Sequence, residues 1–257
     1  MKDILRQISV VITILATIVI NGLANALPLN GLQTGEISDR FQVYFVPAGY
    51  VFSIWGLIYL GLIVYAVFQA LPSQRENPRL RSTGWWVSLS GLANIAWIFL
   101  WHYEQFPLTL LAMLLLLATL IVTYLRLGTR RTSAPIAERL AVRLPFSIYL
   151  GWITVATVAN VTSLLDYLNW DGFGLSPELW MGIILAAVTV IAVLMNFTRR
   201  DLAYALVLLW ALAGIAVKHA GVASVVMPTW FTFAVVALTL PAAFLICRPG
   251  KRGSAAA

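Results

Sequence analysis

Long stretches without a charged side chain constrain this chain more than any other feature of its sequence. Eight such apolar stretches follow one another, and most have the roughly 20 residues that a helix needs to cross the hydrocarbon core of a bilayer. Of all residues 61% are hydrophobic and only 11% are charged. A soluble domain of this size cannot bury so much apolar side chain. We therefore predict an all-α integral, multi-pass membrane protein, and we expect it in the inner (cytoplasmic) membrane of a bacterium.

The predicted spans are separated by loops that carry glycine, proline and charged residues. The first apolar run is long enough to span, so we interpret it as a transmembrane helix rather than as a cleaved signal peptide. A long polar loop, residues 28–48, follows it. The predicted spans are 8–27, 49–71, 85–101, 108–125, 144–165, 178–197, 202–217 and a last span that begins at Pro228 or Thr229 and ends near Cys247.

The basic residues lie on one side of this arrangement. The N-terminus, the loops after the second, fourth and sixth spans and the C-terminal tail hold 15 of the 17 Lys and Arg residues, and only Arg40 and Lys218 lie on the other side. Because basic loops stay in the cytoplasm, we predict that both termini are cytoplasmic and that the loop 28–48 faces outward. The formal charge of +7 then reflects topology, and we expect no nucleic-acid partner.

The spans lack the residues of several functional classes. None carries Asp, Glu, Lys or Arg at its centre, which argues against a proton-coupled pump or an ion channel. A retinal protein would need a lysine in the middle of a helix, whereas Lys218 lies at the end of one. No metal-ligand spacing and no catalytic motif is recognisable, so an enzyme is the less favoured reading, and we interpret His102 and His219 as solvent-exposed loop ends.

One face of the fifth span differs from the rest of its surface. At 100° per residue, this face carries aromatic, small and polar residues: Pro145, Tyr149, Trp152, Ala156, Asn160 and Ser163. The opposite face carries Ile148, Val155 and Val158, which we expect to contact lipid.

The second and third spans carry similar faces. An indole N–H or an amide without a partner in hydrocarbon costs several kcal/mol, so these groups must face protein or a cavity. Plain packing and a pocket for a flat hydrophobic ligand both remain open, while tryptophans nearer the ends, such as Trp101, Trp170 and Trp180, suit the membrane interface. The residues on these faces are Phe52, Trp55 and Tyr59 in the second span and Trp86, Ser90, Asn94, Trp97 and Trp101 in the third.

Three motifs resemble one known family. Pro47-Ala-Gly-Tyr-Val-Phe-Ser-Ile-Trp55, Asn94-Ile-Ala-Trp97 and Leu144-Pro-Phe-x-x-Tyr-x-x-Trp152 resemble motifs of the TspO/MBR family, the tryptophan-rich sensory proteins and the translocator protein. Their order and spacing agree with that family over about residues 8–167.

The resemblance implies a five-helix bundle with a ligand pocket beneath the loop 28–48, which would form its lid. Members of the family bind porphyrins, haem and sterols, so a porphyrin or haem is a possible ligand here, although no cofactor is obligatory. The pocket residues carried over by position are Phe52, Trp55, Tyr59, Asn94, Trp97, Tyr149, Trp152, Ala156 and Asn160.

The chain also departs from the family pattern. Tyr50 stands where the family usually has tryptophan, and the segment 160–169 lacks the basic residue of a sterol motif. We divide the chain into a TspO-like domain (1–167), a three-helix extension (168–247) and a cytoplasmic tail (248–257). The part 178–247 would pack against the bundle or serve contact with a second copy or another membrane protein.

Three functions follow from this reading. The first is binding of tetrapyrroles or similar planar lipophilic molecules, in their transport or sensing. The second is light-dependent degradation of porphyrins by a pocket tryptophan. The third is a structural or regulatory membrane subunit without a small ligand.

Overall fold

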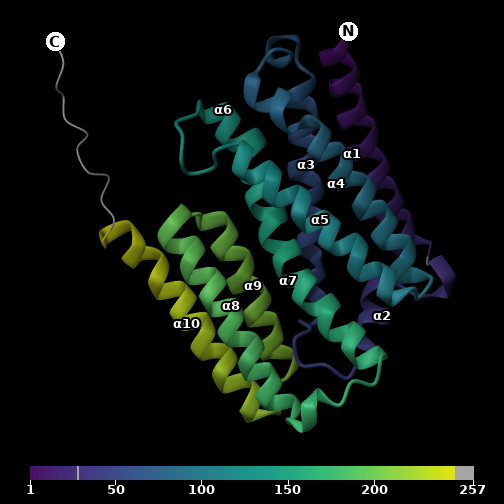
Figure 1. Ribbon diagram of the computed structural model, residues 1–257, viewed down its shortest axis with the longest axis vertical. Coiled ribbons are helices and arrows are strands. Elements are labelled where there is room, and N and C mark those ends of the chain that lie inside the picture. The colour runs from purple at the N-terminus through teal and green to yellow at the C-terminus, as the bar shows by residue number, and fades with distance from the viewer. Residues whose placement is uncertain (28, 247–257) are drawn as a thin grey trace.

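The structure, a computed structural model that describes residues 1–27 and 29–246, consists of eight long helices joined by loops and short helical turns (Figure 1). The described residues contain no strand, which confirms the all-α prediction. Seven helical segments are long and apolar enough to cross a membrane, and α9 is apolar but shorter. The long helices are α1 (Lys2–Ala26), α3 (Ile54–Ala70), α4 (Pro78–His102), α5 (Phe106–Arg126), α7 (Leu144–Tyr167), α8 (Pro177–Arg199), α9 (Leu202–Lys218) and α10 (Ala223–Ile246).

Short helical turns precede several of the long helices. The turn η2 (Gly49–Ser53) leads into α3, and α6 (Ile136–Glu138) with a π-helical turn (Arg139–Arg143) leads into α7. The remaining short elements are η1 (Leu29–Gly31), α2 (Thr34–Asp39), η3 (Pro72–Gln74) and η5 (Gly172–Gly174).

The last long helix begins earlier in the chain than we predicted. We placed this start at Pro228 or Thr229, but α10 begins at Ala223 and contains Pro228 within it. Membrane helices tolerate an internal proline because neighbouring groups satisfy the freed carbonyl. The predicted end near Cys247 lies outside the described residues.

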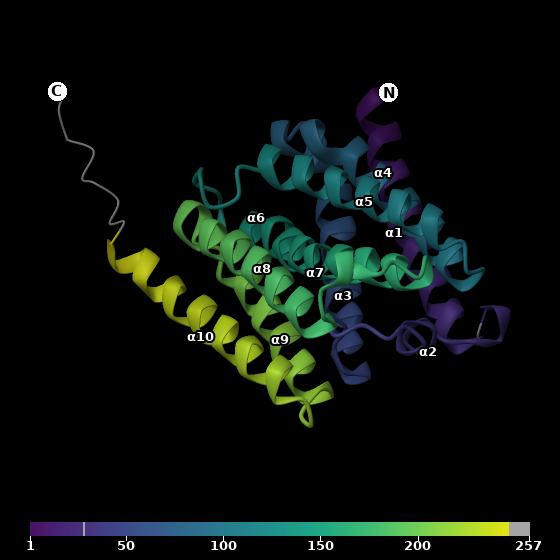
Figure 2. The ribbon, with the colours of Figure 1, turned by 60° about the horizontal axis from the view of Figure 1, so that its bottom comes forward.

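The helices form two groups that meet along α7 and α9 (Figures 1 and 2). In the first group, which we call the bundle, α4 packs on α1 and α5, α5 packs on α7, and α3 packs on α1 and α7. The second group, the three-helix unit, consists of α8, α9 and α10. Gly151 allows α9 to lie close to α7, because a Cβ atom there would lie 3.1 Å from the Cβ of Val207.

This contact overturns the prediction that Ile148 and Val155 face lipid. Both side chains are buried in the structure, because α9 covers this face of α7. Val158 is only partly buried. The end of the predicted first domain at residue 167 coincides with the end of α7, and the division of the chain into these domains stays a prediction.

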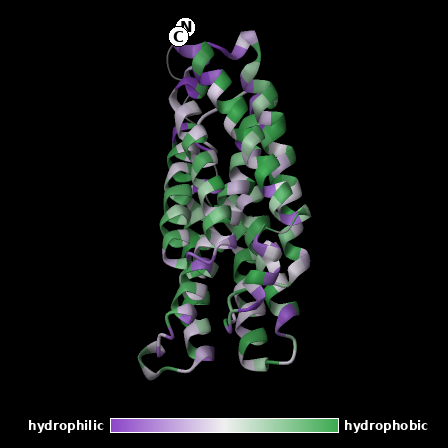
Figure 3. Cartoon of the chain, turned by 90° about the vertical axis from the view of Figure 1, so that its right-hand side faces the viewer, coloured by the Kyte–Doolittle hydropathy of each residue, from purple (hydrophilic) through white to green (hydrophobic). Residues whose placement is uncertain are grey.

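The outer surface is that of a membrane protein. Hydrophobic residues cover the long helices and hydrophilic ones collect near both ends (Figure 3). Large apolar side chains such as Met227, Phe231 and Leu238 on α10 are about 70% exposed. These surfaces contact the lipid bilayer.

Buried polar contacts hold the bundle together inside this apolar shell. Asn21 donates to the Oδ1 of Asn94 (2.7 Å), and Asn94 in turn donates to the hydroxyl of Tyr149 (2.9 Å). This chain of contacts links α1, α4 and α7. Amide and hydroxyl pairs of this kind position helices in a membrane, where apolar side chains alone provide little specificity.

The two groups are also joined at the end that carries most basic residues. The buried carboxylate of Asp201 accepts hydrogen bonds from the hydroxyl of Tyr124 on α5 (2.8 Å) and from that of Ser147 on α7 (2.6 Å). The same carboxylate caps the start of α9 through the backbone N–H of Tyr204. Position and direction of α9 are thereby fixed to the bundle.

Candidate functional site

The loop that follows α1 folds back over the ends of the helices, as predicted. We call its residues 29–48 the lid; Pro28 lies outside the described residues. Its α2 rests on α4, and the rest of the lid runs from α2 toward α9 (Figure 2). Hydrogen bonds join the lid to the end of α7, the start of α8 and the connection between α4 and α5: the backbone N–H of Gln42 donates to Asp166 (3.2 Å), Tyr44 to Glu178 (2.9 Å), and Arg40 pairs with Glu104.

His102 anchors the other end of the lid and is not the exposed loop residue that we predicted. Its side chain is 1% exposed. Its Nδ1 lies 3.0 Å from the carbonyl of Leu29, and its Nε2 lies 3.0 Å from the hydroxyl of Thr34. Because a carbonyl can only accept, Nδ1 carries the proton and Nε2 accepts from Thr34. The sequence alone does not show that the lid covers this histidine.

The end of the lid packs against α9 of the three-helix unit. The backbone N–H of Ala48 donates to the carbonyl of Gly214 (3.2 Å), and the indole of Trp210 donates to the carbonyl of Val51 (3.1 Å). A Cβ atom on Gly214 would lie 2.1 Å from a methyl carbon of Val51. Only glycine therefore allows α9 and η2 to come this close.

His219, at the end of α9, also contacts the lid. Its ring lies edge-on to the ring of Tyr44, with centroids 5.3 Å apart. Burial lowers the pKa of His219, and the charge of Lys218 lowers it further. The hydrogen bond to Glu178 raises the pKa of Tyr44, which keeps the phenol in its donating form.

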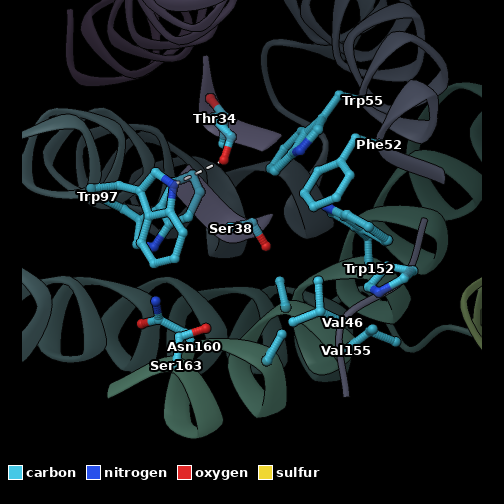
Figure 4. Close-up of a pocket in the computed structure, with 14 residues that line it drawn as sticks. Thr34, Ser38, Val46, Phe52, Trp55, Trp97, Trp152, Val155, Asn160 and Ser163 are labelled. Carbon is cyan, nitrogen blue, oxygen red and sulfur yellow. Dashed lines mark hydrogen bonds between the residues drawn. The ribbon is translucent and has the colours of Figure 1, made fainter. Parts of the chain in front are cut away.

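A cavity lies beneath the lid, between α3, α4 and α7 (Figure 4). Only about 40 Å³ of it is open to the centre of a water molecule, whereas ligand pockets usually measure roughly 300–1,000 Å³. The cavity is therefore closed in this structure. Its lining residues are Thr34, Ser38, Val46, Pro47, Phe52, Trp55, Trp97, Trp101, Trp152, Val155, Ala156, Ala159, Asn160 and Ser163.

Six of the nine residues predicted for a ligand pocket line this cavity. They come from three helical segments that are distant in sequence: Phe52, Trp55, Trp97, Trp152, Ala156 and Asn160.

The other three predicted residues do not line the cavity but pack among themselves and against its wall. The ring of Tyr59 stacks on that of Trp55 at 5.5 Å. Asn94 and Tyr149 are fully engaged in the polar chain that begins at Asn21. These residues support the cavity from outside.

Sequence reasoning missed Trp101, which we assigned to the membrane interface. Its side chain is buried, stacks on Trp97 with centroids 5.6 Å apart and donates to the carbonyl of Thr34 (3.2 Å). The sequence places Trp101 on the same helix face as Trp97, but its position near the end of the span favoured the membrane interface. The lid residues Thr34, Ser38, Val46 and Pro47 gave no such signal, because the lid has no regular period.

Aromatic rings form much of the cavity wall. Phe52 meets Trp152 edge-on at 5.7 Å, and Trp55 meets Trp152 edge-on at 6.3 Å. Trp97 lies across the cavity from them (Figure 4), and the ring of Trp101 stacks on that of Trp97. Edge-on and stacked arrangements of this kind hold rings in fixed orientations, so the flat faces keep their positions around the empty space.

Three buried polar atoms at this cavity lack a hydrogen-bond partner in the described part of the chain. They are the Nε1 atoms of Trp97 and Trp152 and the Oδ1 atom of Asn160. The amide nitrogen of Asn160 is within 3.4 Å of the Thr109 hydroxyl, which leaves its oxygen free. An unsatisfied buried group costs about 1–3 kcal/mol. The site therefore combines flat apolar walls with two free donors and one free acceptor.

Comparison with known proteins now adds to this geometry. Residues 7–244 match the family described as TSPO-like protein. The chain belongs to the TSPO-like family. The match extends over all eight long helices of this TSPO-like chain, the three-helix unit as well as the bundle. No curated protein and no solved structure matches the chain.

Tyr50, which replaces the tryptophan common in the TspO/MBR motif, lies outside the cavity of this TSPO-like chain. It is 49% exposed, and its ring packs edge-on against Trp210 of α9 at 5.4 Å. The residue thus contributes to the contact between η2 and the three-helix unit rather than to the cavity wall.

Proposed function

We propose that this TSPO-like membrane protein binds tetrapyrroles or similar planar lipophilic molecules in the cavity beneath the lid, and acts in their transport or sensing. The observation that carries the proposal is the set of unpaired polar atoms of Trp97, Trp152 and Asn160 among aromatic rings. Unpaired groups are costly in a membrane interior, and a ligand with complementary groups would satisfy them.

The chemistry of a porphyrin matches these groups. Its flat ring system suits the faces of Trp55 and Trp97. Its carboxylates or ring nitrogens can accept from the free indole N–H groups, and a ring N–H can donate to the Oδ1 of Asn160. These contacts fix the orientation of a flat ligand that apolar walls alone would leave free to rotate.

A ligand of this size can enter only if the lid moves, because the closed cavity holds little more than water. The lid is held by buried contacts at Thr34 and by surface contacts such as the pair of Arg40 and Glu104, which are 51% and 36% exposed. Exposed ion pairs contribute only about 0–1 kcal/mol each, so the part of the lid that follows α2 opens at a lower cost than the bundle unfolds.

Quenching of tryptophan fluorescence by protoporphyrin tests the proposal in detergent micelles. We expect saturable quenching with the protein. Trp152→Phe keeps a ring but removes the free N–H, and it should weaken binding by about tenfold, the equivalent of roughly 1.4 kcal/mol. Trp230→Phe, on the exposed surface of α10, is the matched control and should leave the affinity unchanged.

Two results would contradict the proposal. One is porphyrin, haem and bilin binding that does not exceed binding to empty micelles. The other is equal loss of affinity in the Trp152→Phe and Trp230→Phe proteins, which would locate binding at the outer surface. Illuminating the wild-type complex and assaying for porphyrin breakdown products separates simple binding from the degradation alternative.

A further inference from the structure

A second and larger hollow lies at the same end of the molecule, on the other side of the lid. It is a groove between the last turns of α7 and the first turns of α8, closed above by lid residues 42–45 and by the connection 166–177. About 380 Å³ of it is open to the centre of a water molecule, within the range of ligand sites. It stays open because α8 packs on α9 and α10 rather than on α7.

The groove has an apolar floor and an aromatic rim. Val158, Val161 and Ile184 from α7 and α8 form the floor. The rim carries Trp170 and Trp180, whose ring centroids are 4.9 Å apart.

The connection between α7 and α8 is shaped around Trp180. The indole N–H of Trp180 donates to the carbonyl of Gly172 (2.7 Å). Gly172 adopts a positive φ of 66°, and a Cβ atom there would lie 3.0 Å from the indole nitrogen. Glycine is therefore required for this turn, and the turn holds the aromatic rim in place.

The charge of the groove is negative and not balanced by a basic side chain. Asp166 and Asp171 are the charged residues that line it, and within the described ranges neither forms an ion pair. Each uses one oxygen to accept a backbone N–H, from Gln42 at 3.2 Å and from Phe173 at 3.0 Å. The nearby Lys218 is paired with Asp39.

We propose that this groove binds a lipophilic cation, that is, an onium or ammonium centre attached to an apolar body. The carboxylates of Asp166 and Asp171 attract the charge, and the faces of Trp170 and Tyr44 add cation–π contact. The apolar body lies on the floor between α7 and α8. The same chemistry occurs in free lipophilic cations and in the choline headgroup of a lipid. The proposal is independent of porphyrin binding in the closed cavity.

A pair of ions of the same shape and opposite charge tests this site. Binding of tetraphenylphosphonium and of tetraphenylborate is measured by equilibrium dialysis against the full-length protein in dodecyl maltoside, whose headgroup is an uncharged sugar. We expect saturable binding of the phosphonium ion and no binding of the borate beyond that of empty micelles. Equal binding of both ions would overturn the proposal, because the site would then recognise only apolar bulk.

Variants locate the binding. Asp166→Asn with Asp171→Asn removes both charges but keeps the oxygens that accept from Gln42 and Phe173, so the fold should persist, as unchanged gel-filtration elution would verify. Phosphonium affinity should fall by about tenfold or more. Trp170→Leu should lower it by roughly two- to tenfold.

Ala156→Leu is the control, since it adds bulk to the closed cavity and leaves the groove untouched. Unchanged phosphonium binding in Ala156→Leu, with loss in the aspartate variant, supports the groove. The reverse pattern would assign the cation to the closed cavity and overturn the proposal. Competition by short-chain phosphatidylcholine would identify a lipid headgroup as the source of the onium group, and competition by benzyltrimethylammonium alone would identify a free cation.

Discussion

The bundle and the three-helix unit are both apolar helical assemblies, but they treat their buried polar groups differently. In the three-helix unit the few polar side chains pair with each other: Asn196 donates to Thr239 (3.0 Å) and Thr189 to Thr232 (3.3 Å). Between the bounds of α8, α9 and α10 no buried polar side-chain atom lacks a partner, and the Nε2 of His219, which directly follows α9, is the exception in the described part of this unit. The bundle contains several such atoms, including three at its cavity.

This difference separates a scaffold from a site. Polar groups that are paired within a membrane protein serve packing. Groups left unpaired reduce stability, and the ligand that we propose would satisfy those of Trp97, Trp152 and Asn160. The three-helix unit contributes to the site indirectly, because the end of the lid packs closely against Gly214.

Two asparagines provide the strongest test of this comparison, one in each group. Asn94→Leu removes the only partner that the buried Tyr149 hydroxyl has among the described residues, and we expect a loss of about 2–3 kcal/mol in the free energy of unfolding. Asn196→Leu should cost less than about 1 kcal/mol, because the Thr239 hydroxyl that it contacts also donates to the carbonyl of Val235 (2.8 Å). Unfolding in mixed micelles measures both. Equal losses would show that the two groups do not differ in this way.

Two glycine substitutions should show which part of the three-helix unit holds the lid. Gly214→Ala places a methyl group against Val51 and should cost about 1–2 kcal/mol through overpacking, with faster trypsin cleavage at Arg40 in the lid. Gly182→Ala on α8 has no neighbour within 4 Å of the added Cβ and should be neutral or slightly stabilising. An unchanged cleavage rate in the Gly214→Ala protein would show that α9 does not hold the lid closed.

The smallest expected effect is a dependence of stability on pH through His219. Since its pKa is lowered in the folded protein, the unfolded chain binds this proton more readily, and the contribution of His219 is lost as the pH falls below about 6.5. Beside it lie Lys218, which pairs with Asp39, and Tyr44, which donates to Glu178. The difference in melting temperature between wild type and His219→Gln should narrow from pH 7.5 to pH 5. A difference in melting temperature that does not change with pH would show that the pKa of His219 is not lowered in the folded protein.

The sequence was sufficient to predict the helices and one face of the site. Period and composition correctly indicated eight apolar helices, and the regular spacing of Trp152, Ala156 and Asn160 predicted which face of α7 borders the cavity. These inferences worked because a helix imposes a fixed period on its side chains. That a ligand occupies the cavity stays a prediction.

The remaining features depend on contacts between segments far apart in the chain, which a periodic pattern does not encode. Ile148 and Val155 have the composition of a lipid-facing surface, and only the position of α9 buries them. Trp101 and His102 stand at a helix end, where exposure is the ordinary expectation, until the lid covers them. The lid itself has neither period nor regular composition, so its share of the cavity wall was not predictable.

The segment 42–47 has a consequence beyond closing the site. Its first four residues belong to the wall of the acidic groove, and Val46 and Pro47 belong to the wall of the aromatic cavity. A single stretch of six residues thus forms a wall that the cavity and the groove share. If a ligand in one site displaces this wall, the affinity of the other site for its ligand changes, and by thermodynamic reciprocity the effect must be equal in both directions.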